Sequence, residues 1–133
     1  MVDVLGNLLQ VVVHAANIHD TKAAPNLLAK TAKQYPSISA FSADAGYRGT
    51  TVSYVTDVLK LQCHISTKIK DTFAILPKRW VVERTFAWLG NFRRLAKDVE
   101  RLVNTAENFI RIAMIKLTLN KISNLNDKSI MAA

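Results

Sequence analysis

Two short apolar segments on either side of a helical segment constrain the fold of this chain more than any other feature. Residues 39–43 and 61–66 have the length and apolar pattern of short strands. Residues 50–60 between them have helical spacing, and their expected buried stripe is Val52, Val55, Val58 and Leu59. A strand, a crossover helix and a second strand favour parallel pairing. The pattern therefore predicts an α/β fold, a mixed sheet with helices on its faces.

The residues before these strands predict a hairpin. Residues 2–5 and 8–15 are apolar, and the dipeptide Gly6-Asn7 that separates them is typical of a tight turn. We expect the two runs to pair as antiparallel strands.

A helix should follow the hairpin. Asp20 is expected to cap its N-terminus, and the helix is expected to run to about Lys33. Pro25 fits only if it lies in the first turn, where a missing N–H breaks no helical hydrogen bond. Residues 34–36 should end the helix, because a residue that precedes proline avoids the helical region.

A third helix is predicted from Lys78 to about Lys97. One face of it should pack on the sheet, and this face contains Val81, Thr85, Trp88, Phe92 and Leu95.

The last predicted helix opens at a capping-box pattern over residues 104–107 and runs to about Ile122. Apolar residues cover it almost all round, so we expect it to be buried or paired with a partner. Residues 1–123 are expected to form one domain, and residues 124–133 a disordered tail.

The positive charge is concentrated in the C-terminal half of the chain. The 133 residues have a formal net charge of +8. The stretch from Lys78 to Lys97 contains six basic residues and one acid, Glu83. So basic a chain is expected to bind a polyanion, with nucleic acid favoured over an anionic membrane surface. A solvated helix face explains the same charge without any partner.

Other features exclude several classes of protein. The apolar runs are far too short to span a bilayer, and the N-terminus lacks the basic and apolar regions of a signal peptide. The single cysteine, Cys63, excludes an internal disulfide framework and a cysteine-cluster zinc site. We expect a cytoplasmic protein without a membrane partner.

Asp44 is the first candidate for chemistry. It directly follows the strand at residues 39–43. In sheets with parallel strands, ligands bind at the carboxyl ends of those strands. We therefore expect Asp44 to lie at the edge of the sheet where a site would form.

Glu83 is the second candidate. On a helix it shares a face with Arg79, Ala87, Gly90 and Arg94, whose small and basic side chains would admit and hold a phosphate. Carboxylate and phosphate oxygens are the ligands that magnesium prefers, and two such ions assist phosphodiester chemistry. An ion pair between Glu83 and Arg79, worth about 0.3–0.5 kcal/mol, is the simpler explanation of the spacing.

Two sequence blocks resemble the DDE transposases of bacterial insertion sequences. The first is ADAGYRG at residues 43–49, and the second is WVVERTFAWL at residues 80–89, followed by RRLAKD at residues 93–98. The resemblance extends upstream to VDVLG at residues 2–6 and HAANIHD at residues 14–20. It covers nearly the whole chain, and its glutamate block is highly specific.

The resemblance implies a ribonuclease H-like fold in which two aspartates and one glutamate hold magnesium or manganese. By motif, Asp44 resembles the second aspartate and Glu83 the glutamate. The family cuts and joins DNA by direct transesterification, so the resemblance implies DNA transposition and recombination, with transposon ends and target DNA as partners. The residues expected to contact DNA are Tyr47, Arg48, Lys78, Arg79, Arg84, Arg93, Arg94 and Lys97.

The chain departs from the family pattern around the glutamate. The glutamate helix of the wider family often carries a tyrosine, an arginine and a lysine at set distances from the glutamate. Arg79 matches the arginine, whereas Leu76 and Gly90 occupy the other two places. Arg93 and Arg94 would have to supply the missing cation.

The first catalytic aspartate is the larger departure. In a ribonuclease H-like sheet it lies on the first, central strand, and this strand is expected to lie upstream of Met1. Asp3 is then expected to be a hairpin residue without a catalytic role. We expect the C-terminal portion of a transposase, either the second reading frame of a split element or a remnant, with little activity alone.

Unpaired strand edges in such a fragment would favour a homodimer or docking with the missing N-terminal portion. Two other functions stay open for this chain. One is a non-catalytic DNA-binding module or regulator derived from a transposase, whose binding would fall steeply with salt. The other is a metal-dependent nuclease of the same fold without strand transfer.

Overall fold

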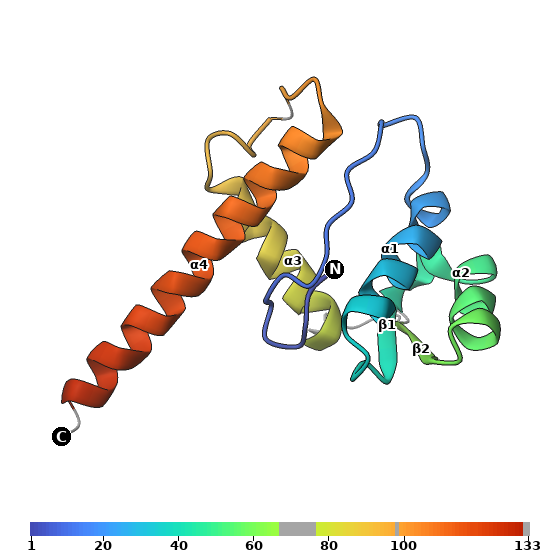
Figure 1. Ribbon diagram of the computed structural model, residues 1–133, viewed down its shortest axis with the longest axis horizontal. Helices are drawn as coiled ribbons and strands as arrows, with labels where there is room; N and C mark the ends of the chain where they lie inside the picture. The colour runs from blue at the N-terminus through green and yellow to red at the C-terminus, as the bar shows by residue number, and fades with distance from the viewer. Residues whose placement is uncertain (67–76, 98, 132–133) are drawn as a thin grey trace, which may run out of the picture.

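The computed structural model describes the backbone of residues 1–66, 77–97 and 99–131, and the side chains of residues 1–66, 80–97 and 99–124 (Figure 1). A small sheet with two helical segments beside it forms one part of the molecule, and two further helices form the other (Figure 1).

The predicted parallel strand pair is confirmed. Strand β1, Ala40–Asp44, pairs with strand β2, Gln62–Ser66, in parallel, with Ala40 opposite Gln62 and Asp44 opposite Ser66. In the part of the chain that the structure describes, the sheet contains only these two strands. The fold is therefore mixed α/β, and both outer edges of the pair lack a neighbouring described strand.

A small apolar core joins the sheet to the helices beside it. Its buried members are Ala24 and Leu28 from helix α1, Phe41 from β1, and Val55, which is fully buried. Burying a side chain of the size of Leu or Val contributes about 1.5–3 kcal/mol. This core fixes β1, and therefore its last residue Asp44, in relation to the helices.

Helix α1, Asp20–Gln34, is capped by His19, and the prediction that Asp20 caps it was wrong. The His19 Nδ1 atom accepts a hydrogen bond from the Thr21 N–H at 3.3 Å, which satisfies a donor of the first turn. Asp20 is the first helical residue, and Pro25 lies in the second turn instead of the first. The predicted end of the helix is confirmed at Gln34.

The helix predicted over residues 50–60 has two parts, helix α2 at Thr50–Ser53 and a π-helical turn at Tyr54–Val58. A π turn holds more residues than an α turn and rotates later residues away from the expected stripe. Val58 is accordingly 62% exposed, and the prediction that it is buried was wrong. Lys60, with φ of 56°, follows and leads the chain into β2.

The predicted N-terminal hairpin is reduced to a turn. Val2 and Leu8 form an isolated antiparallel bridge, and the described backbone of residues 1–15 contains no regular strand. Asp3 organises the turn: its Oδ1 accepts hydrogen bonds from the Leu5 N–H at 2.9 Å and the Asn7 N–H at 2.8 Å. Such carboxylate bonding to nearby backbone N–H groups favours a wider turn than the predicted two-residue one.

Helix α3, Pro77–Gly90, is shorter than predicted. The expected continuation to Lys97 was wrong, because the chain forms turns from Asn91 onward, directly after Gly90. Glycine is a poor helix former and often ends helices. On the described part of α3, Thr85 is buried as predicted, whereas Phe86 is 69% exposed.

Helix α4, Val103–Met131, is longer than predicted and passes the expected end near Ile122. Residues 124–131 contain neither glycine nor proline, so no helix breaker stops it. The capping-box prediction was also wrong: the Glu107 carboxylate bonds Val13 and Arg111 instead of turning back onto the helix start. The domain boundary at residue 123 stays a prediction.

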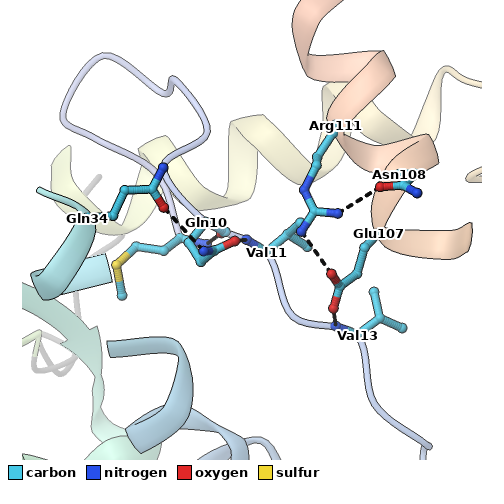
Figure 2. A network of polar contacts seen from close by, with 8 residues as sticks. Gln10, Val11, Val13, Gln34, Glu107, Asn108 and Arg111 are labelled. Carbon is cyan, nitrogen blue, oxygen red and sulfur yellow. Dashed lines mark hydrogen bonds and ion pairs between the residues drawn. The ribbon is translucent and has the colours of Figure 1, made fainter. Parts of the chain in front are cut away.

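Figure 2 shows how the N-terminal segment is attached to α4. The Val13 N–H donates to Glu107 Oε1 at 3.1 Å, and Arg111 donates to Glu107 Oε2 at 2.8 Å and to Asn108 Oδ1 at 2.9 Å. Glu107 is only partly exposed, which favours these bonds over water. The network ties the extended segment before α1 to the first turns of α4.

No helix among the described residues is long and apolar enough to cross a membrane.

Candidate functional site

Asp44 lies where the sequence places it, at the carboxyl end of β1. Its Oδ1 accepts a hydrogen bond from the Gly46 N–H at 2.9 Å, so the side chain caps the short 3-10 turn Ala45–Tyr47. The residue is exposed, and the described residues give its second oxygen no hydrogen-bond partner. The capping bond fixes the carboxylate while one oxygen stays accessible to a ligand.

Tyr47 lies in the short turn that follows Asp44. Burial raises the pKa of the Tyr47 hydroxyl, and the negative charges of Asp20 and Asp44 raise it further. Asp20 also lies 3.4 Å from the His14 Nε2 atom.

Asp20 was expected to cap a helix, whereas the structure places its Oδ1 beside the imidazole of His14. The block at residues 14–20 begins with His14 and ends with Asp20, and its resemblance to the family pointed to this pair. The turn after the N-terminal segment brings the two side chains together.

Glu83 is an exposed residue of α3. Helix α3 packs against β1, so the helix that carries Glu83 contacts the strand that ends in Asp44. The two elements that the predicted site requires are therefore adjacent. The convergence of the two carboxylates on a common ion stays a prediction.

Arg84, the neighbour of Glu83, lies between two tryptophan rings. Its guanidinium carbon is 4.5 Å from the centroid of Trp80 and 4.6 Å from that of Trp88, and its Nη2 donates to the Leu5 carbonyl at 3.2 Å. Lys121 of α4 approaches the same Trp88 ring at 5.0 Å. Cation–π contacts of this kind contribute about 0.5–1 kcal/mol each. The stack connects α3 with the N-terminal turn and with α4.

Gly6 completes this contact. Its φ of +84° suits glycine, and a Cβ at this position would lie 3.1 Å from Arg84 Nη2 and 3.5 Å from Thr85 Oγ1. The absence of a side chain therefore lets the turn backbone approach α3 closely. The turn therefore favours glycine at position 6 for two reasons, the positive φ and the lack of a side chain.

The other residues expected to contact DNA are dispersed. Arg48, Arg93 and Lys97 are exposed. Arg94 lies beyond the end of α3, pairs with Glu100 at 2.6 Å and stacks on the Phe109 ring at 4.7 Å, so it does not share a helix face with Glu83 as predicted. The side chains of Lys78 and Arg79 lie outside the described residues, and with them the alternative ion pair of Glu83.

No group of three or more His, Cys, Asp or Glu side chains that could hold a metal ion is found among the described residues. The chain supplies two candidate carboxylates, one on β1 and one on α3, from elements that touch. Such hard oxygen donors suit magnesium or manganese. Asp44 and Glu83 are therefore suitable as two of the ligands of such an ion.

The fold and these positions define an α/β domain with an acidic residue at the end of a parallel strand and a glutamate on a helix packed against it. The family model described as Transposase DDE domain matches residues 1–117, and the chain belongs to this family. The resemblance drawn from the sequence is thereby confirmed, and the protein has a transposase-related function. Comparison with curated proteins and with solved structures found no match.

Proposed function

We propose that this chain supplies Asp44 and Glu83 to the metal centre of a DNA transposase of a bacterial insertion sequence. The supporting observation is the contact between α3 and β1, which makes neighbours of the elements that carry the two acids. Membership of the family over residues 1–117 supports the same assignment. The fold proposed for the complete domain is ribonuclease H-like.

In the proposed reaction, a water molecule attacks a phosphodiester at the transposon end, and the freed 3′-hydroxyl then attacks the target DNA. Magnesium or manganese, when bound, would activate the attacking oxygen and stabilise the leaving one. Asp44 and Glu83 would hold the cation. The exposed cations Arg48, Arg93 and Lys97 would hold phosphates on either side of the site.

The proposed centre needs a third acid, and no group of three or more His, Cys, Asp or Glu side chains that could hold a metal ion is found among the described residues. Asp3 is committed to its turn through bonds to Leu5 and Asn7. We propose that the first aspartate comes from a strand outside these 133 residues, which would pair with the outer edge of β1. The chain alone would then cleave DNA poorly or not at all.

Metal binding can be tested without any catalytic activity. Iron(II) with ascorbate and peroxide cleaves a polypeptide next to the residues that hold the ion. Cleavage of the chain near both 44 and 83, suppressed by excess magnesium, is expected. Asp44→Asn and Glu83→Gln should each abolish both cuts, whereas the exposed Asp57→Asn should leave them. Cleavage at only one of the two positions would show that the carboxylates do not share an ion.

DNA chemistry distinguishes the remaining alternatives. The chain, with an aspartate-bearing upstream segment restored, is incubated with manganese and a labelled transposon end. Joining of the 3′ end to a second duplex supports a transposase, and cleavage without joining supports a nuclease. Salt-sensitive binding without cleavage would support a non-catalytic DNA-binding regulator.

A further inference from the structure

Helices α3 and α4 are joined by a segment of turns (Figure 1), and a short ion pair lies within it. The Arg94 Nη2 atom donates to Glu100 Oε1 at 2.6 Å. Charge-assisted bonds of this kind are shorter and stronger than neutral ones. The guanidinium also lies over the Phe109 ring of α4, with its central carbon 4.7 Å from the ring centroid. Arg94 is therefore held twice, by its own segment and by the helix that follows.

The two partners of this ion pair differ in exposure. The Glu100 side chain is only 14% exposed, whereas the Arg94 side chain is 59% exposed. The carboxylate therefore lies on the inner side of the pair and the guanidinium on the outer side. A guanidinium has five N–H donors, and Glu100 is the one hydrogen-bond acceptor that the described residues give to Arg94. A ligand can reach the remaining donors from the solvent without displacing Glu100.

The charge around Arg94 suits an anionic ligand. Residues 91–102 contain four basic residues and two acids. Besides Arg94, the basic residues are Arg93, Lys97 and Arg101, and all three are exposed. The planar guanidinium presents its donors in a fork that matches two oxygens of a phosphate. A fork that is already fixed loses less conformational entropy when it binds.

We propose that Glu100 and Phe109 position Arg94 to bind a phosphate of the DNA backbone. Arg94 is then the DNA contact, and the other two are positioning residues. The alternative is that Glu100 mimics a phosphate and blocks Arg94. Burial opposes this alternative, because the acid lies on the inner side of the pair. The proposed role rests on the proposed function, since it requires that the chain bind DNA, but it does not depend on the metal centre.

The salt dependence of DNA binding measures the contact that Arg94 makes. The affinity of the full chain for a fluorescent DNA duplex of arbitrary sequence is followed as salt is added. When the logarithm of the binding constant is plotted against that of the salt concentration, each phosphate contact adds about 0.9 to the steepness. Arg94→Ala should lower the steepness by this amount. Glu100→Ala should lower it equally, and the double variant should lose no more than either single variant.

Glu100→Gln is the matched control for Glu100→Ala. Both variants lack the negative charge, but glutamine keeps a carbonyl oxygen where Arg94 needs an acceptor. Glu100→Gln should therefore keep most of the wild-type steepness. If Glu100 blocked Arg94, both neutral variants would bind DNA with a steeper salt dependence than wild type. A steepness that rises or stays unchanged in Glu100→Ala overturns the proposal, even where urea unfolding shows a loss of stability.

Phe109→Leu tests the second positioning residue without any change of charge. It keeps an apolar side chain on α4 but removes the ring face, so the steepness should fall as in Glu100→Ala. Arg93→Ala, at the neighbouring exposed arginine, should add its effect to that of Glu100→Ala. A wild type that binds DNA as Arg94→Ala does would overturn this inference alone. A wild type without salt-dependent binding would overturn it together with the DNA partner of the proposed function.

Discussion

Arg84 on α3 donates a hydrogen bond from Nη2 to the backbone carbonyl of Leu5, 79 positions earlier in the chain, at 3.2 Å. The same guanidinium stacks between Trp80 and Trp88, at 4.5 and 4.6 Å from their centroids. One side chain thus fixes the helix that carries Glu83 to the N-terminal turn. These contacts give the Arg84 guanidinium partners within the chain, and its expected contact with DNA stays a prediction.

Replacing Arg84 by lysine should lower the stability of the protein although the charge is kept. A lysine ammonium cannot lie flat between two rings while it bonds the Leu5 carbonyl. The expected loss in the free energy of unfolding is about 1–2 kcal/mol, the sum of weakened cation–π and hydrogen-bond contributions. Urea unfolding measures it. Arg93→Lys, at an exposed site, is the control and should change stability by less than about 0.5 kcal/mol.

Gly6→Ala should be more destabilising than Gly49→Ala. Both glycines have positive φ, +84° and +83°, so alanine is strained at either position. Only at Gly6 would the new Cβ also meet neighbouring atoms, with Arg84 Nη2 at 3.1 Å, whereas nothing lies within 4 Å at Gly49. A left-handed helical conformation costs alanine on the order of 1–2 kcal/mol, and at Gly6 the contact with Arg84 adds to the strain of the positive φ. Equal unfolding midpoints for the two variants would contradict the close approach of the turn to α3.

The parallel strand pair could be predicted because it depends on local pattern. Apolar runs of strand length around a helical segment left few alternatives, and β1 and β2 lie within one residue of the expected positions. The end of α3 was misjudged because the apolar spacing continues to Leu95, whereas Gly90 stops the helix. The helix start at His19 was missed because an imidazole nitrogen is an uncommon cap.

The candidate site could be predicted only in part. Motif position placed Asp44 at the end of a strand and Glu83 on a helix, as the structure has them. The partners of Arg84, Arg94 and Glu107 could not be predicted, because each of these side chains bonds or stacks on a different element that the chain reaches only after folding. Helical spacing gives the face of a residue but not the element that covers it.

The stabilising role of Asp3 should depend on pH. Burial alone would raise the pKa of this carboxyl, but hydrogen bonds from Asn7, Leu5 and Gly6 outweigh burial and leave the pKa below its ordinary value of 3.8. The folded state therefore favours the ionised form, so the contribution to stability is present above this ordinary value and is lost as the pH falls through the lower folded pKa. Asp3→Asn should be less stable than wild type at neutral pH.

Acid unfolding curves of the two proteins measure this effect. The difference in unfolding free energy between wild type and Asp3→Asn should shrink as the pH falls below 3.8, the ordinary value for this carboxyl. Asp57→Asn serves as the control, since the Asp57 carboxylate is exposed and, among the described residues, accepts a hydrogen bond only from the adjacent Thr56. A difference that stays constant down to strongly acid pH would show that Asp3 does not act through its charge.

Tyr47 provides a test of the surroundings of Asp44 that needs neither DNA nor metal. Burial raises the pKa of its hydroxyl, with further contributions from the charges of Asp20 and Asp44, so its phenol should ionise above the ordinary value of 10.0. Because the folded state then holds the proton more tightly than the unfolded state, the stability contribution is fully present below pH 10 and falls as the pH rises through the folded pKa. Ultraviolet titration of the tyrosinates follows the ionisation.

Asp44→Asn should lower the pKa of Tyr47 toward its ordinary value, because it removes one of the two negative charges that oppose ionisation. Asp20→Asn should act in the same direction, and the double variant should lower the pKa further, leaving only the effect of burial. Carbon-13 labelling of the tyrosine rings assigns the signal by comparison with Tyr47→Phe. An unchanged Tyr47 titration in Asp44→Asn would mean that the Asp44 carboxylate points away from the phenol and that its charge does not act on the turn after β1.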